Sequence, residues 1–159
     1  MSNKKIKAIE IKELGHVVLY VSNLKKSADF YRDVLGFPEV GRVGNVGVMF
    51  SGGRTHHELL LLEVGGKPEI KSSPKPGLYH IGFKIGDSPE DVKRAYEELK
   101  EKKVPIIGKT DHTVTHSLYI EDPDGNELEL YADVSDEWKK SSRWTLKPAK
   151  HLHIDEDWD

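Results

Sequence analysis

Two segments of the chain begin in the same way, with a histidine followed by alternating apolar residues. The first covers residues 16–21 and the second residues 80–85. Successive side chains of a β-strand point to opposite faces, so each segment predicts a strand with one face against a core. His16 and His80 are the first residues on the opposite, non-apolar faces of these two strands. The apolar faces comprise Val17, Leu19 and Val21 in the first segment and Ile81, Phe83 and Ile85 in the second.

A helix is predicted after each of these strands. The first helix has Asn23 as its N-cap and Gly36 at the position of a left-handed C-cap. The second helix lies within residues 87–103, where Ser88 and Asp91 have the spacing of a capping box. Both helices carry an apolar stripe that predicts a buried face. The stripes are Leu24, Ala28, Tyr31 and Leu35 in the first helix and Val92, Ala95, Tyr96 and Leu99 in the second.

Strand-like runs follow each helix, so a βαβββ order occurs twice along the chain. The turn-forming sequence Asp-Pro-Asp-Gly joins the last two runs. We therefore expect an α+β fold in which two tandem βαβββ modules form an open, curved, barrel-like sheet around a cavity. The predicted segments are an N-terminal arm or leading strand in residues 1–13, modules in residues 14–64 and 78–133, a linker in residues 65–77, and a C-terminal tail of unassigned role in residues 134–159.

Composition narrows the class of protein. Of the 159 residues, 36% are hydrophobic and 32% are charged, and the formal net charge is −3. This balance favours neither a nucleic-acid partner nor a membrane surface. The chain has no cysteine, which excludes disulfides and thiolate metal sites. No secretory signal is visible at the N-terminus, so we expect a cytoplasmic protein.

The same alternation assigns the residues of the last predicted strand of the second module to two faces. Leu128 and Leu130 lie on the strand face toward the helix, and Glu129 lies on the opposite face, toward the cavity. His16, His80 and Glu129 then all face the same concave surface. Two imidazoles and one carboxylate with open coordination positions suit Fe(II), with Mn(II), Ni(II), Co(II) and Zn(II) as alternatives. The sequence therefore predicts a metal centre with these three ligands.

The repeat and three of its stretches resemble the vicinal oxygen chelate superfamily. The stretches are "GHVVLYV…SADFYRDVLGF", "YHIGFKI" and "DPDGNELELY", and the resemblance covers residues 14–133. This superfamily includes glyoxalase I, bleomycin-resistance proteins, methylmalonyl-CoA epimerase and extradiol ring-cleaving dioxygenases. The resemblance implies the fold, but a fold by itself does not choose the reaction.

A more specific resemblance lies in "TDHTVTHSLYIEDPDGNELE", which is similar to the extradiol dioxygenase signature. The resemblance implies that Glu129 is the metal carboxylate, that Tyr119 binds a substrate hydroxyl and that His112 assists near the substrate or oxygen. It also implies a small-molecule substrate with two vicinal oxygens. The positions that match the signature are Thr110, His112, Leu118, Tyr119, Asp122, Pro123, Gly125 and Glu129.

The stretch "RTHHELLLL" also resembles the extradiol enzymes, in which a histidine at this place is an acid–base catalyst. His56 and His57 cannot both face the cavity from a regular strand, and local similarity favours His57. Glu58 leaves an alternative open, because a glutamate near this place is a fourth metal ligand in glyoxalase I. With Glu58 as a ligand, the site suits lyase or isomerase chemistry better than oxygen activation.

Three functions therefore remain open on sequence grounds. The leading one is an extradiol-type dioxygenase that cleaves a catechol-like ring. The first alternative is a glyoxalase- or epimerase-type lyase or isomerase with nickel, cobalt or zinc. The second is a metal-free ligand-binding protein of the bleomycin-resistance kind. The resemblance also implies a homodimer, and many dioxygenases of this superfamily have four modules where this chain has two.

Overall fold

The computed structural model describes residues 9–68 and 74–154. The predicted α+β architecture is confirmed, since two βαβββ units follow one another in the chain. The start of the N-terminal arm, part of the linker and the last five residues lie outside the described part. Residues 9–13 contain neither helix nor strand. Within the described residues, no helix is long and apolar enough to cross a membrane.

The first module forms a four-stranded sheet in the order β1-β4-β3-β2. Strand β1 is parallel to β4, and the other neighbours are antiparallel. The predicted first helix is divided, because its second half is wound as a π-helical turn. The elements are β1 (Val17–Val21), α1 (Leu24–Asp29), the π-turn η1 (Phe30–Val34), β2 (Glu39–Val43), β3 (Gly47–Phe50) and β4 (Leu59–Glu63).

The second module repeats this order in a five-stranded sheet, β5-β8-β7-β6-β9. The fifth strand comes from the C-terminal tail, whose two-residue β9 pairs antiparallel with the edge strand β6. The elements are β5 (His80–Gly86), α2 (Pro89–Glu101), β6 (Gly108–Asp111), β7 (Thr115–Glu121), β8 (Glu127–Asp133), α3 (Glu137–Lys140), the 3₁₀ turn η2 (Ser142–Leu146) and β9 (Lys150–His151).

Local sequence signals explain where the two main helices begin. The Asn23 side chain accepts a hydrogen bond from the backbone N–H of Lys26, as an N-cap does. At α2, the Ser88 hydroxyl accepts from the N–H of Asp91, and the Asp91 carboxylate accepts from the N–H of Ser88. This is the predicted capping box. Gly36 has a φ of 66°, which suits the left-handed end of the first helical segment.

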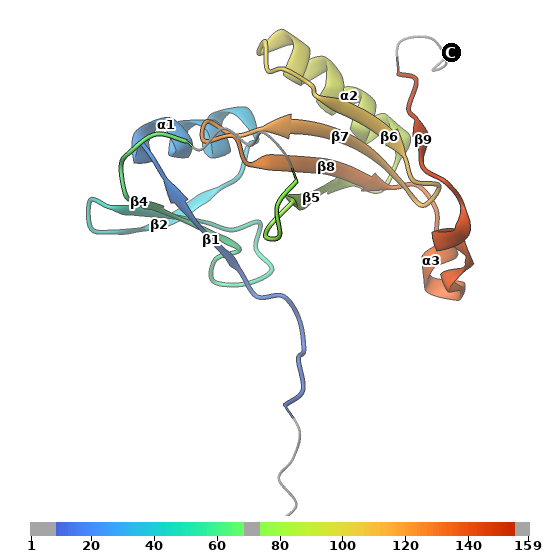
Figure 1. Cartoon of the computed structure of the whole chain (residues 1–159), viewed down its shortest axis with the longest axis horizontal. Helices are drawn as coiled ribbons and strands as arrows, with labels where there is room; N and C mark the ends of the chain where they lie inside the picture. Colours follow the sequence, from blue (N-terminus) through green and yellow to red (C-terminus); the bar gives the residue numbers. More distant parts are fainter. Residues whose placement is uncertain (1–8, 69–73, 155–159) are drawn as a thin grey trace, which may run out of the picture.

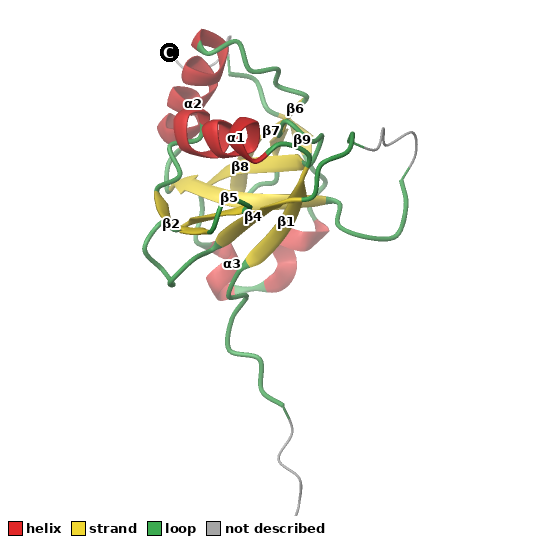
Figure 2. Ribbon diagram, turned by 90° about the vertical axis from the view of Figure 1, so that its left-hand side faces the viewer, coloured by secondary structure: helices red, strands yellow, loops and turns green. Residues whose placement is uncertain are grey.

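The core lies between the sheets and the two main helices, α1 and α2, which cover the same side of both sheets (Figures 1 and 2). The helix-facing residues predicted by alternation are largely buried, including Val21, Leu61 and Leu128. On the other face of β1, Val18 is 43% and Tyr20 is 71% exposed. Each module therefore buries one sheet face and leaves part of the opposite face uncovered.

Buried polar contacts join the two modules. The Tyr31 hydroxyl of η1 donates a 2.9 Å hydrogen bond to the carboxylate of Asp122, in the turn between β7 and β8. Both residues are buried, and burial together with Asp122 raises the pKa of Tyr31. In the same turn, Asp124 accepts hydrogen bonds from the backbone N–H of Ser22 and from the hydroxyl of Ser27. These contacts fix α1 and η1 against the start of β8.

Replacement of Tyr31 by phenylalanine tests this junction. Tyr31→Phe removes one donor from a buried carboxylate, so we expect the free energy of unfolding to fall by about 1.5–3 kcal/mol. Urea denaturation followed by circular dichroism measures the change. Tyr20→Phe is the matched control, because Tyr20 is exposed. Equal stability of the two variants would contradict a role for the Tyr31–Asp122 contact.

Candidate functional site

Strands β5 and β8 place His80 and Glu129 side by side. The two strands are parallel neighbours, with Gly82 opposite Glu129 in the register. A Cβ at Gly82 would lie 3.5 Å from Oε2 of Glu129, which is an ordinary van der Waals contact, so Gly82 lies directly beside the carboxylate. The Nε2 atom of His80 lies 3.2 Å from that Oε2. Two ligands of one first-row ion, each about 2.0–2.2 Å from the metal, lie at a separation of about 3 Å. The pair therefore fits a shared divalent ion.

The other oxygen of Glu129 is held by hydroxyl groups from the adjacent strand β7. Its Oε1 accepts a 2.6 Å hydrogen bond from Ser117 and a 3.2 Å bond from Tyr119. Burial, followed by the charge of Glu129, raises the pKa of Tyr119, so the phenol keeps its proton at neutral pH. The Glu129 carboxylate thus has Oε1 bonded to hydroxyls and Oε2 directed at His80.

His112 extends this arrangement by one residue. Its Nε2 lies 2.9 Å from the Tyr119 hydroxyl. Because Tyr119 donates its only proton to Glu129, the His112 N–H must be the donor in this contact. His112, Tyr119 and Glu129 therefore form a hydrogen-bonded chain in which each residue donates to the next. Such a chain can orient a substrate hydroxyl and pass a proton along it.

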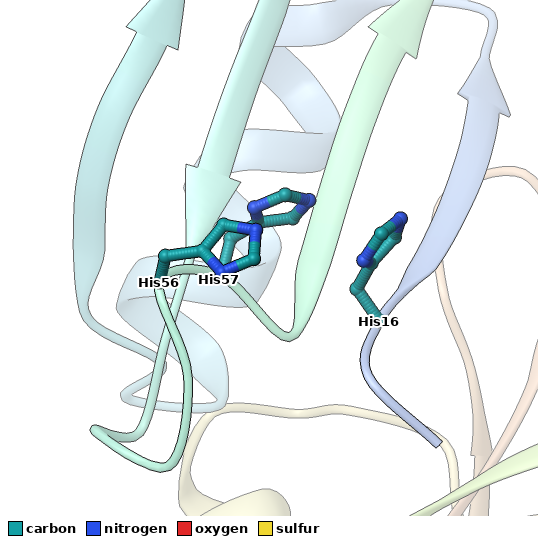
Figure 3. Close-up of side chains that lie close together, drawn as sticks. All are labelled: His16, His56 and His57. Carbon is teal, nitrogen blue, oxygen red and sulfur yellow. The ribbon is translucent and has the colours of Figure 1, made fainter. Parts of the chain in front are cut away.

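The histidines of the first module form a separate cluster (Figure 3). His16 precedes β1, whereas His56 and His57 lie in the loop that leads into β4. The ring centroids of His16 and His57 are 4.5 Å apart, and those of His56 and His57 are 4.4 Å apart. Burial, together with His16 and His56, lowers the pKa of His57, so its imidazole is neutral near pH 7.

Arg54 ties this cluster to the start of β1. Its guanidinium donates to the backbone carbonyl of Gly15 and to the carboxylate of Glu58, each at 3.1 Å, and pairs with Glu13 at 3.2 Å. Glu58 also accepts from the backbone N–H of Gly52. The Glu58 carboxylate is thus held by Arg54 and the loop backbone, and its role as a fourth metal ligand stays a prediction.

Within the chain, the three predicted metal ligands are divided between the two clusters. In the described ranges, the only group of three histidine or acidic residues with ligand atoms all within 4.8 Å of one another is His16, His56 and His57. His16 does not complete the His80–Glu129 pair in this way. A cavity of about 580 Å³ is lined by residues of both modules. Its lining includes His16, Arg54 and Glu58 from the first module and Gly82 and Tyr131 from the second.

Sequence reasoning missed two residues that shape these clusters. Ser117 shares the strand phase of Tyr119, and this phase was the available signal for it. Arg54 gave no signal, because its contacts depend on how the loop before β4 folds back on the N-terminal arm. His116 lies near Asp111, with Nε2 3.8 Å from the carboxylate, and so does not join the pair formed by His80 and Glu129.

Comparisons with known proteins give the family. The profile of the Glyoxalase/Bleomycin resistance protein/Dioxygenase superfamily matches residues 13–130. A catechol-2,3-dioxygenase of Bacillus subtilis is 33% identical over 123 residues, which are 76% of this chain and 41% of that protein. The metallothiol transferase FosB of Staphylococcus epidermidis is 36% identical over 146 residues, which are 91% of this chain and 99% of that protein.

A solved structure of lactoylglutathione lyase from Agrobacterium tumefaciens has the same architecture. It aligns with a TM-score of 0.59 and 25% identity, over 77% of this chain and 95% of that one. The chain spans less than two thirds of the dioxygenases that it matches, but nearly the whole of the transferase. The extent of the profile match and these identities together show that the chain belongs to the glyoxalase/bleomycin resistance protein/dioxygenase superfamily.

Proposed function

We propose that this protein is a metal-dependent dioxygenase that cleaves a catechol-like ring with molecular oxygen. The observation that carries the proposal is the hydrogen-bonded chain from His112 through Tyr119 to Glu129. These three residues match the extradiol signature, and the chain ends on the carboxylate beside His80. The identity to a catechol-2,3-dioxygenase supports the same reaction.

In this proposal, His16, His80 and Glu129 hold the metal, Fe(II) or Mn(II) being the ions that suit a site with a carboxylate and open positions. A bound ion would supply Lewis-acid chemistry, polarising the two substrate oxygens and lowering their pKa. Tyr119 and His112 bind and orient one of these oxygens through the hydrogen-bonded chain. His57, neutral near pH 7, accepts a proton from the substrate and returns it to the product.

A second copy of the chain completes the site in this proposal. His16 lies in a cluster apart from His80 and Glu129, so one chain offers one ligand from its first module and two from its second. The sheet face that begins with His16 is uncovered and continues through the exposed Val18 and Tyr20. In a two-fold homodimer, the first module of each copy faces the second module of the other.

A second candidate function is thiol transfer. The observation in its favour is the match to a metallothiol transferase over 91% of this chain and 99% of that protein. The dioxygenase match covers 41% of the B. subtilis enzyme. The same three ligands would hold a divalent ion that polarises an electrophilic substrate toward attack by a thiol.

Metal loading and oxygen uptake test the first candidate. Protein loaded anaerobically with Fe(II) or Mn(II) is expected to consume oxygen with members of a catechol panel and to form a ring-opened product. His80→Gln and Glu129→Gln should each abolish Mn(II) binding, measured by electron paramagnetic resonance, because Mn(II) needs the carboxylate-containing site. The control is Glu121→Gln, a carboxylate at the exposed end of β7. Thiol consumption with electrophiles and no oxygen uptake would select the second candidate.

Tyr119→Phe separates orientation from metal binding. This variant keeps both ligands of the second module but breaks the hydrogen-bonded chain. We expect Mn(II) binding to persist and kcat for catechol cleavage to fall by about 10- to 100-fold. Tyr96→Phe, on α2, is the control and should leave both unchanged. An unaltered kcat in Tyr119→Phe would show that the hydrogen bonds linking His112, Tyr119 and Glu129 do not contribute to catalysis.

Mixed dimers test whether the site is shared between copies. His16→Gln and Glu129→Gln are each expected to be inactive. When they are co-expressed, half of the dimers are mixed and each has one intact site, so about a quarter of wild-type activity should return. His80→Gln co-expressed with Glu129→Gln is the control, because both changes lie in the second module and no site is restored. Absence of recovery in the first mixture would show that each site is built within one chain.

A further inference from the structure

The cluster of His16, His56 and His57 has a geometry of its own. Strands β1 and β4 pair in parallel, with Val17 opposite Leu59, so the segments that precede them meet at the same end of the sheet. The backbone N–H of Val17 donates to the carbonyl of Glu58 at 3.0 Å. The parallel pairing thus brings a histidine before β1 next to two histidines before β4 (Figure 3).

We propose that His16, His56 and His57 form a second metal site, whose ligand set differs from that of the centre that contains Glu129 but shares His16 with it. One ligand atom from each imidazole lies within 4.8 Å of the other two. Three nitrogens bound to a tetrahedral Zn(II) lie about 3.3 Å apart, as Zn–N distances of 2.0–2.1 Å require. A small inward movement of exposed side chains is enough to close this gap, since His16 and His56 are exposed.

The ligand set defines which ions the site takes. No carboxylate belongs to the group, so it offers three nitrogen donors and an open fourth position for water. Imidazole donors suit Zn(II), Co(II), Ni(II) and Cu(II), whereas Mn(II) prefers carboxylates. The two proposed sites share His16, and one chain can therefore use this residue in only one of them at a time.

The surroundings of the cluster support metal binding. The Nδ1 atom of His57 is buried and has no hydrogen-bond partner among the described residues. The hydroxyl of Thr55 lies 3.1 Å from Nδ1 of His56, which fixes that ring and leaves its other nitrogen for a ligand role. The nearby positive charge of Arg54 is balanced by Glu13 and Glu58. A bound cation therefore meets little repulsion from it.

Cobalt binding in the Glu129→Gln protein tests this site, because that change removes the carboxylate-containing centre. We expect one Co(II) per chain, with the intense visible absorption of four-coordinate Co(II), and displacement by Zn(II). Adding His56→Gln should weaken Co(II) binding by at least about tenfold and abolish the absorption. The matched control is His151→Gln in the same background, because His151 and His153 form another histidine pair, with ring centroids 4.8 Å apart.

Three outcomes overturn the proposal. They are no Co(II) binding to Glu129→Gln, unchanged binding after His56→Gln is added, and loss of binding after His151→Gln is added. Circular dichroism of each variant is the check that it is folded. The single variant His56→Gln separates this inference from the proposed function, because it should keep Mn(II) binding. If wild-type protein binds no Mn(II) and Glu129→Gln still binds Co(II), the proposed function fails and the three-histidine site stands.

Discussion

The contact between Tyr31 and Asp122 constrains how the two modules dock, and so where the side chains of each module lie relative to the other. It joins η1 of the first module to the turn that begins β8 of the second. A buried carboxylate is costly unless its oxygens are bonded, and Asp122 also accepts from the N–H of Asp124 and twice from Asn126. The junction can therefore form only when the modules are docked in one arrangement. That arrangement places both main helices on one side of the sheets. His80 and Glu129 alternate with the buried residues of β5 and β8, so they belong to the opposite sheet face.

This arrangement has a direct consequence for the chemistry. The second module presents a carboxylate whose Oε1 is already bonded to Ser117 and Tyr119, so Glu129 has Oε2 available for a metal. As a metal ligand, Glu129 would therefore bind through one oxygen. The three-histidine group of the first module contains no carboxylate. This group thus offers imidazole nitrogens, whereas the second module offers a carboxylate oxygen. A ligand set that combines His16 with Glu129 therefore requires a first module to face a second module.

Alternation and capping predicted much of this structure, because both are local. Alternation placed His80 and Glu129 on the same concave surface, and the spacing of Ser88 and Asp91 predicted the start of α2. That β5 and β8 are neighbours was learned only from the structure. Non-local features gave no such signal. The two-residue strand β9 exists only because β6 has a free edge, and the separation of His16 from Glu129 depends on how whole modules dock. The split of the first helix into α1 and η1 was also not predicted, since its apolar spacing fits an ordinary helix.

The shared residue His16 makes the choice of metal a question of ligand chemistry rather than of fold. In the proposed dioxygenase centre, His16 would bind the ion with His80 and Glu129, a set of two nitrogens and one oxygen that suits Fe(II) and Mn(II). In the proposed second site it would bind with His56 and His57, a set of three nitrogens that suits Zn(II), Co(II), Ni(II) and Cu(II). The affinity of either ligand set for divalent first-row ions rises from manganese to copper, so affinity alone does not select the ion. The supply of each ion and the formation of the dimer would both influence which set uses His16. Because β1 and β4 pair in parallel within one chain, the three-nitrogen set forms without a partner. Association of two copies would then compete with that set for His16.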